Sequence, residues 1–93
     1  MIITFKCKET EQIFNRRFSN QFPQNIQHRA RKKLLMLDSA TRLDDLRIPP
    51  ANRLEALKGD RKGQHSIRIN DQWRICFVWK DDNVYDVEIV DYH

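Results

Sequence analysis

Apolar and polar residues alternate most strictly in residues 64–80, QHSIRINDQWRICFVWK. The interruption NDQ divides this stretch into two runs, a pattern typical of two half-buried strands in an antiparallel hairpin. Side chains two residues apart in a strand point the same way. The pattern therefore predicts that Arg68 and Arg74 project from the face opposite the isoleucines. That face is either a solvated surface or a phosphate-binding site.

The N-terminal half contains one predicted strand and two predicted helices. Residues 1–5 are short and rich in β-branched side chains, which favours a first strand. Within residues 8–18, Phe14 and Phe18 are four residues apart, which favours one or two helical turns. The second helix is predicted from Pro23, a residue suited to a first turn, to about residue 38. Its apolar residues recur at helical spacing: Ile26, Ala30, Leu34 and Leu37.

The opposite face of this second helix is basic and carries His28, Arg29, Arg31, Lys32 and Lys33. Such a cluster can bind an RNA backbone or a partner protein, but it is more often the solvated side of an amphipathic helix. The solvated side is the interpretation favoured here.

The C-terminal half is predicted to consist mainly of turns and strands. Residues 39–52 are irregular, with one helical turn over 43–46 and a stop at the Pro49-Pro50 pair. A short strand is predicted over 53–57. Residues 58–63 form a turn with two glycines and three cations, which is either a plain surface loop or, as we favour, an edge that faces phosphate groups.

Residues 84–90 alternate as a final strand, with Tyr85, Val87 and Ile89 predicted on one side. The order of elements predicts an α+β fold, in which two N-terminal helices pack on one face of a mainly antiparallel β-sheet. Function is then expected on the other face of the sheet. Ninety-three residues suffice for a modest core, so residues 1–93 are predicted to form a single domain.

The charge balance favours a polyanionic partner. Lys and Arg outnumber Asp and Glu by 17 to 13, which gives a formal net charge of +4. Cys7 and Cys76 match no metal-ligand spacing, and Cys76 is expected to be a small buried hydrophobe. The chain shows no signal peptide and no membrane-spanning run. We therefore expect a protein of the reducing cytoplasm with no disulfide, metal or other cofactor.

Several short motifs together resemble one known family. They are LKGDR at residues 57–61, SIRIN at 66–70, QWRI at 72–75 and DYH at 91–93. This set resembles the HigB branch of the RelE-like toxins, the toxin halves of bacterial toxin–antitoxin pairs, also called plasmid-maintenance killer proteins. MIITFKCKETEQIF and RIPPANRLEAL fit the same family, so the resemblance covers nearly the whole chain.

The resemblance implies a small endoribonuclease with a microbial-RNase-like fold, which cleaves mRNA on the translating ribosome and so inhibits translation and growth. It also implies a HigA-type helix-turn-helix antitoxin, joined in a heterotetramer of two toxins and two antitoxins. Operator DNA would be contacted only through the antitoxin. We expect the antitoxin to contact the helices or the first strand, away from the basic sheet face, and to block entry into the ribosome.

Matched motif by motif, the catalytic positions that the resemblance implies are Lys58, Arg74, Asp91, Tyr92 and His93. The two cations would stabilise the charge that develops as a 2′-hydroxyl attacks the phosphate. His93 would act as general acid or base. Asp91 would orient His93 or share the role of base, and Tyr92 would stack on a base or donate a proton.

Four further residues are predicted to bind RNA. Loop position and strand alternation favour Arg61, Lys62 and Arg68. Glu55 stands where some family members carry a histidine shortly before the LKG motif. Either Glu55 substitutes for that histidine or His93 takes a larger share of the chemistry.

Two other classes of function compete with a nuclease. One is a non-catalytic module that binds RNA or the ribosome and inhibits translation by occupancy. The other is a structural partner whose basic sheet face docks an acidic protein. Growth arrest on expression, rescued by the neighbouring gene, would distinguish a toxin from the last of these.

Overall fold

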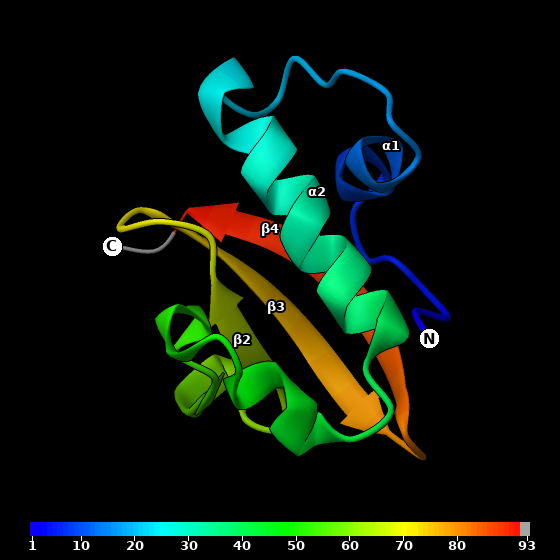
Figure 1. The fold of residues 1–93 in the computed structure, drawn as a ribbon, viewed down its shortest axis with the longest axis vertical. Helices are drawn as coiled ribbons and strands as arrows, with labels where there is room; N and C mark the ends of the chain where they lie inside the picture. The colour runs from blue at the N-terminus through cyan, green and yellow to red at the C-terminus, as the bar shows by residue number, and fades with distance from the viewer. Residues whose placement is uncertain (92–93) are drawn as a thin grey trace.

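The computed structural model describes residues 1–91, and Tyr92 and His93 lie outside the described residues. Its sheet has four antiparallel strands in the order β1-β2-β3-β4. They are β1 (Glu55–Ala56), β2 (His65–Arg68), β3 (Trp73–Lys80) and β4 (Asn83–Asp91) (Figure 1). The predicted hairpin is confirmed, because Ile67 pairs with Ile75 across β2 and β3.

Two α-helices precede the strands and pack on one face of the sheet, as predicted. Helix α2 (Gln24–Ser39) lies over the sheet and runs in nearly the same direction as β3 in this view, and α1 (Lys8–Phe14) packs beside it (Figure 1). α1 is shorter than the predicted 8–18 because Arg16 adopts a left-handed φ of 63°, which an α-helix cannot continue. Phe18 consequently lies outside the helix and is exposed.

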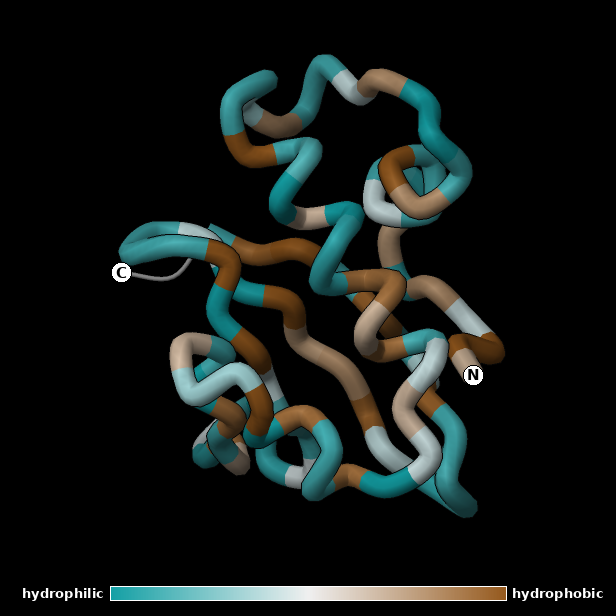
Figure 2. The backbone as a smooth tube through the Cα atoms, viewed as in Figure 1, coloured by the Kyte–Doolittle hydropathy of each residue, from teal (hydrophilic) through white to brown (hydrophobic). Residues whose placement is uncertain are grey.

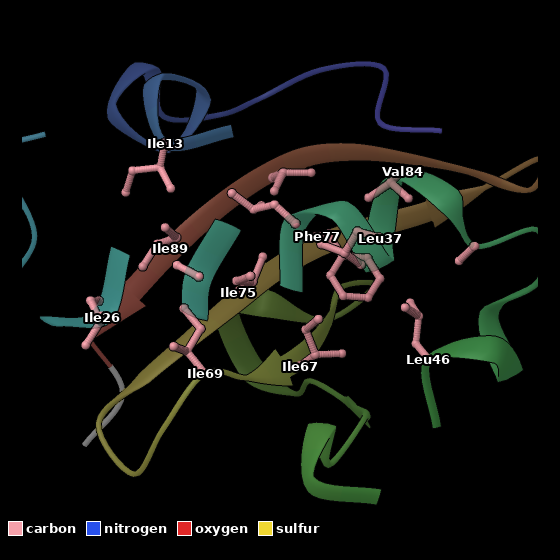
Figure 3. Packing of buried hydrophobic residues seen from close by; sticks show 14 residues of the cluster. Ile13, Ile26, Leu37, Leu46, Ile67, Ile69, Ile75, Phe77, Val84 and Ile89 are labelled. Carbon is pink, nitrogen blue, oxygen red and sulfur yellow. The ribbon is translucent and has the colours of Figure 1, made fainter. Parts of the chain in front are cut away.

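The core lies between α2 and the sheet. All four apolar positions predicted for the second helix are buried, and they face buried isoleucine, phenylalanine and valine side chains of the strands. Figure 2 shows the hydrophobic segments of the strands passing beneath α2. Figure 3 shows Leu37 of α2 next to Phe77 of β3, within the same cluster as Ile67, Ile69 and Ile75. This packing fixes which face of the hairpin is buried and leaves the arginine-bearing face on the other side.

The N-terminal segment only partly fulfils the predicted strand. It runs parallel to β4 and makes two isolated bridges, Ile2 with Val84 and Phe5 with Val87. Between these bridges the backbone N–H of Asp86 bonds the Thr4 hydroxyl at 2.9 Å. A side chain therefore replaces a backbone acceptor in the middle of the segment, and the ladder is interrupted.

The predicted alternation in β4 is wrong at Tyr85 because the strand contains a β-bulge. Cys76 pairs with Glu88 and Val78 with Tyr85, so two residues of β4 stand opposite Phe77 alone. One of the two, Asp86, has φ 54°. Such an extra residue reverses the alternation of side chains. Val84 therefore joins the buried cluster, and Tyr85 points with Val78 to the other face.

The prediction that Lys33 is solvated is also wrong. Lys33 is only 9% exposed, and its ammonium donates a hydrogen bond to the side-chain oxygen of the fully buried Asn52. The amide nitrogen of Asn52 donates to the carbonyl of Leu46 at 3.1 Å. Two 3₁₀ turns, η1 (Leu43–Arg47) and η2 (Pro50–Asn52), are thereby fastened to α2. Burial, together with the nearby cation of Arg29, lowers the pKa of Lys33.

Candidate active site

Arg68 and Arg74 face each other as a cross-strand pair at the end of β2 and β3. This confirms that they share the sheet face opposite the core. Arg74 is only 8% exposed although it lies on the open face. Its Nε donates to Ser66 Oγ at 2.8 Å, and its Nη2 donates to the carbonyl of Arg53, also at 2.8 Å. The guanidinium group is therefore held in one orientation.

The backbone at Arg53 makes the second of these hydrogen bonds available. Arg53 follows η2 and adopts the left-handed conformation, with φ 46° and ψ 54°. For a residue other than glycine this conformation is uncommon. It turns the chain into β1, where Glu55 pairs with Ser66. Glu55 Oε1 lies 3.6 Å from Nη2 of Arg74, so a carboxylate and a fixed cation meet on the open face.

A hollow of about 300 Å³ opens beside these groups. Its lining residues are Arg53, Arg68, Asn70, Asp71 and Arg74. Arg68 forms an ion pair with Asp71 of the β2–β3 turn. Three arginines thus line one hollow, and the guanidinium group is well suited to binding phosphate because it donates several hydrogen bonds in a fixed plane.

Lys58 and Glu55 share a second hollow of about 410 Å³, together with Ala56, Leu57 and Arg61. Lys58 immediately precedes η3 (Gly59–Arg61), a short 3₁₀ turn within the predicted phosphate-facing turn. Gly59 has φ 64°, a conformation that glycine adopts without strain. Lys58 and Glu55, which the sequence analysis named in separate motifs, therefore line the same hollow.

The side chain of Arg61 connects η3 to strand β4. Its Nη1 donates to Glu88 Oε1 on β4 at 2.7 Å and to Gln64 Oε1 at 3.1 Å. The hydrogen bond to Glu88 raises the pKa of Arg61. This contact holds η3, and with it the neighbouring Lys58, against the open face. Lys62 is exposed just after η3.

Asp91 ends β4 opposite Trp73, one position beyond the pair formed by Val90 and Arg74. Its Oδ2 accepts a hydrogen bond from the Gln72 side chain at 3.1 Å. Alternation along the strand places Asp91 on the side of Trp73 rather than that of Arg74. The structure therefore gathers Arg74, Arg68, Glu55 and Lys58 on the open face and Asp91 at its end. The predicted roles of Tyr92 and His93 fall outside the described residues.

Sequence reasoning missed the groups that hold the predicted site residues in place. Ser66 and the Arg53 carbonyl orient Arg74, and Glu88 anchors Arg61. Ser66 is two residues before Arg68 in β2, so the alternation of side chains already indicated that Ser66 lies on the same face. Cys76 lies between Ser66 and Glu88 in the sheet and is fully buried as predicted, and burial raises the pKa of its thiol.

The described residues contain no group of three or more His, Cys, Asp and Glu side chains arranged to hold a metal ion. Within residues 1–91, no helix has the length and apolar character needed to cross a membrane. The described part of the site consists of fixed cations that lie beside carboxylates.

The fold is that of the RelE-like toxins. YafQ from E. coli superimposes with a TM-score of 0.64 at 11% sequence identity, covering 98% of this chain and 93% of that one. The YoeB–YefM toxin–antitoxin complex from Staphylococcus aureus, a heterotetramer, gives a TM-score of 0.62 at 16% identity, over 100% and 98% of the two chains. At such low identity the likeness concerns the fold alone.

Sequence comparison identifies the family. The family model described as RelE-like toxin of type II toxin-antitoxin system HigB matches residues 3–93. Toxin HigB-1 of Vibrio cholerae serotype O1 is 43% identical over 82 residues, which cover 87% of this chain and 86% of the relative. Endoribonuclease HigB of Proteus vulgaris is 32% identical over 93 residues and covers both chains fully. The chain belongs to the HigB-like family of type II toxins.

Proposed function

We propose that this protein is a metal-independent endoribonuclease toxin, which cleaves mRNA on the translating ribosome. The observation that carries the proposal is the buried Arg74, fixed by Ser66 and the Arg53 carbonyl in a hollow that it shares with Arg68. The relative from Proteus vulgaris is named an endoribonuclease, which supports the same activity here. The net charge of +4 suits an RNA substrate.

The proposed reaction is an in-line attack of the 2′-hydroxyl on the adjacent phosphate. Negative charge then grows on the non-bridging phosphate oxygens. Arg74 is already oriented, and so it stabilises that charge without reorganising during the reaction. Lys58 supplies a second cation from the neighbouring hollow. Removing one such fixed donor costs on the order of 10²–10³ in rate.

Proton transfer needs a base for the 2′-hydroxyl and an acid for the departing 5′-oxygen. Glu55 is a candidate base because its carboxylate is 3.6 Å from Nη2 of Arg74 and borders the hollow of Lys58. His93 remains the predicted general acid or base. Asp91 would orient it or share the role of base, and Tyr92 would stack on a base or donate a proton. A positioned acid or base contributes on the order of 10²–10⁴ in rate.

The proposed partner is a HigA-type antitoxin with a helix-turn-helix domain, in a heterotetramer of two toxins and two antitoxins. The heterotetrameric YoeB–YefM complex, whose toxin shares this fold, supports such an assembly. The antitoxin would contact the helices or the N-terminal segment and exclude the toxin from the ribosome. The proposed site of action is the cytoplasm, because the translating ribosome is there.

The test is cleavage of a translated mRNA in a reconstituted translation reaction, followed by primer extension. Lys58→Ala and His93→Ala should each lower the cleavage rate by about 10² or more. Lys80→Ala removes an exposed lysine at the far end of β3 and should cleave normally. If folded His93→Ala and Lys58→Ala proteins arrest growth as strongly as the unaltered chain, inhibition works by occupancy and the nuclease proposal fails.

A further inference from the structure

The basic face of α2 is divided between two hollows. Arg29, Lys32 and Lys33 line one hollow of about 410 Å³ next to the β2–β3 turn. His28 and Arg31 line another, of about 360 Å³, next to Arg16 and Arg17 after α1. Only the first of these two borders the candidate active site, so the two halves of the basic face are not equivalent.

The first hollow lies next to the hollow that contains Arg74. Arg68 and Asn70 line both of them. Taken together, the two linings contain six cationic side chains and one carboxylate, that of Asp71, which is paired with Arg68. The cations are Arg29, Lys32, Lys33, Arg53, Arg68 and Arg74. Glu55 pairs with Arg74 from beside the second hollow, so cations still outnumber carboxylates six to two. Such an excess of cations along neighbouring hollows matches a chain of phosphates rather than a single anion.

The walls of this hollow are held in place by contacts on both sides. Arg29 Nη1 donates to the carbonyl of Ile69 in the β2–β3 turn at 3.4 Å. Lys33 donates to Asn52, which ties η2 to α2. Met36, Ala51 and Ile69 supply an apolar surface between the cations. Phosphates can thus meet the cations, as in the basic grooves that follow the backbone of a single-stranded nucleic acid, while a base can contact the apolar side chains.

We propose that the single-stranded RNA next to the cleaved linkage crosses Arg68 and lies in the hollow between α2 and the β2–β3 turn, with Lys32 contacting a phosphate. This extension of the site rests on the proposed function, because it takes the scissile phosphate to lie at Arg74. It assigns Arg29 and Lys32, the exposed cations of α2 that line this first hollow, to substrate. Arg16, Arg17 and Arg31 lie around the other hollow and outside this path.

The test measures binding of 2′-O-methyl oligoribonucleotides, which lack the attacking hydroxyl, by fluorescence anisotropy in low-salt buffer. In the unaltered protein, lengthening the oligonucleotide should tighten binding and steepen its salt dependence. Lys32→Glu should weaken binding of the longer oligonucleotide roughly tenfold, because such a change in affinity corresponds to the loss of about one charge-assisted hydrogen bond. It should also reduce the salt slope by about 0.7, the value for one phosphate contact on a single strand.

Arg17→Glu is the matched control, because Arg17 is also exposed and the change in net charge is the same. It should leave both the affinity and the slope unchanged. Equal weakening by the two variants, or a Lys32→Glu protein that keeps the length dependence, would overturn the inference. So would equal competition by polyglutamate, which would indicate an acidic protein as occupant.

The two proposals fail separately. A protein that binds the longer oligonucleotide through Lys32 but cuts no translated mRNA would contradict the nuclease function and support this binding path. A protein that cuts translated mRNA but shows no effect of Lys32→Glu on binding would contradict the path alone.

Discussion

Replacing Arg74 by lysine tests whether the open face requires a guanidinium group held in one orientation, or only a positive charge. A single ammonium cannot reach both Ser66 Oγ and the Arg53 carbonyl, each of which lies 2.8 Å from a different nitrogen of Arg74. One charge-assisted hydrogen bond is therefore lost, which costs about 1.5–3 kcal/mol in the free energy of unfolding. For a domain of this size that corresponds to a fall in Tm on the order of 10 °C.

The assay is urea unfolding followed by circular dichroism, with thermal melts as a second measurement. Arg68→Lys is the matched control, since Arg68 stands opposite Arg74 on the same face but pairs with Asp71, whose side chain is 97% exposed. Exposed pairs contribute about 0–1 kcal/mol, so Arg68→Lys should change stability little. Cleavage is then measured well below both melting temperatures, so that a loss in Arg74→Lys reports placement and not unfolding.

Two outcomes would refute this reasoning. If Arg74→Lys is as stable as Arg68→Lys, the two short hydrogen bonds do not hold the guanidinium in place. If Arg74→Lys is destabilised but cleaves at the full rate, the orientation of the group has no part in catalysis, and charge alone suffices.

Two further predictions concern groups around the site. Burial, and to a smaller extent the cation of Arg47, lowers the pKa of His65 below its usual 6.5. The unfolded chain therefore binds the proton more readily than the folded protein does. The free energy of unfolding should be highest above pH 6.5 and should fall as the pH drops through the folded-state pKa. In His65→Phe, the urea midpoint should depend less on pH between about pH 5 and 7. An unchanged pH dependence would contradict the assignment of this effect to His65. A double-mutant cycle on Arg61→Ala and Glu88→Gln should give a coupling of about 1 kcal/mol, because the pair is partly exposed. The longer pair of Lys6 with Glu88, at 3.8 Å, should couple less, and the reverse order would exclude Glu88 as the anchor of η3.

The parts of the fold that follow from local sequence were predictable. Period-two alternation on each side of NDQ defined the hairpin, and the side chain of Asn70 accepts the turn hydrogen bonds from the backbone of Gln72 and Trp73. Because the alternation fixes the faces, the shared position of Arg68 and Arg74 followed directly. Helical spacing likewise identified the buried side of α2.

The errors arose where distant residues determine the local structure. At the bulge, the backbone N–H of Asp86 donates a hydrogen bond to the hydroxyl of Thr4, 82 positions away in the sequence. The burial of Lys33 depends on Asn52. A period read along one helix or one strand contains no information about such contacts. The same limit applies to Arg74, whose acceptor at Arg53 arises only from the left-handed turn after η2.

The pairing of the N-terminal segment with β4 determines where the protein can be attached to a surface or a probe. Val84 donates its backbone N–H to the carbonyl of Met1 at the start of β4, whereas Asp91 ends the strand seven residues later (91 − 84). At about 3.3 Å per residue, the two points are roughly 20 Å apart. An affinity handle or fluorophore joined ahead of Met1 therefore emerges at the opposite end of the strand from Asp91, and immobilisation through this end leaves the arginine-lined hollow open to large ligands.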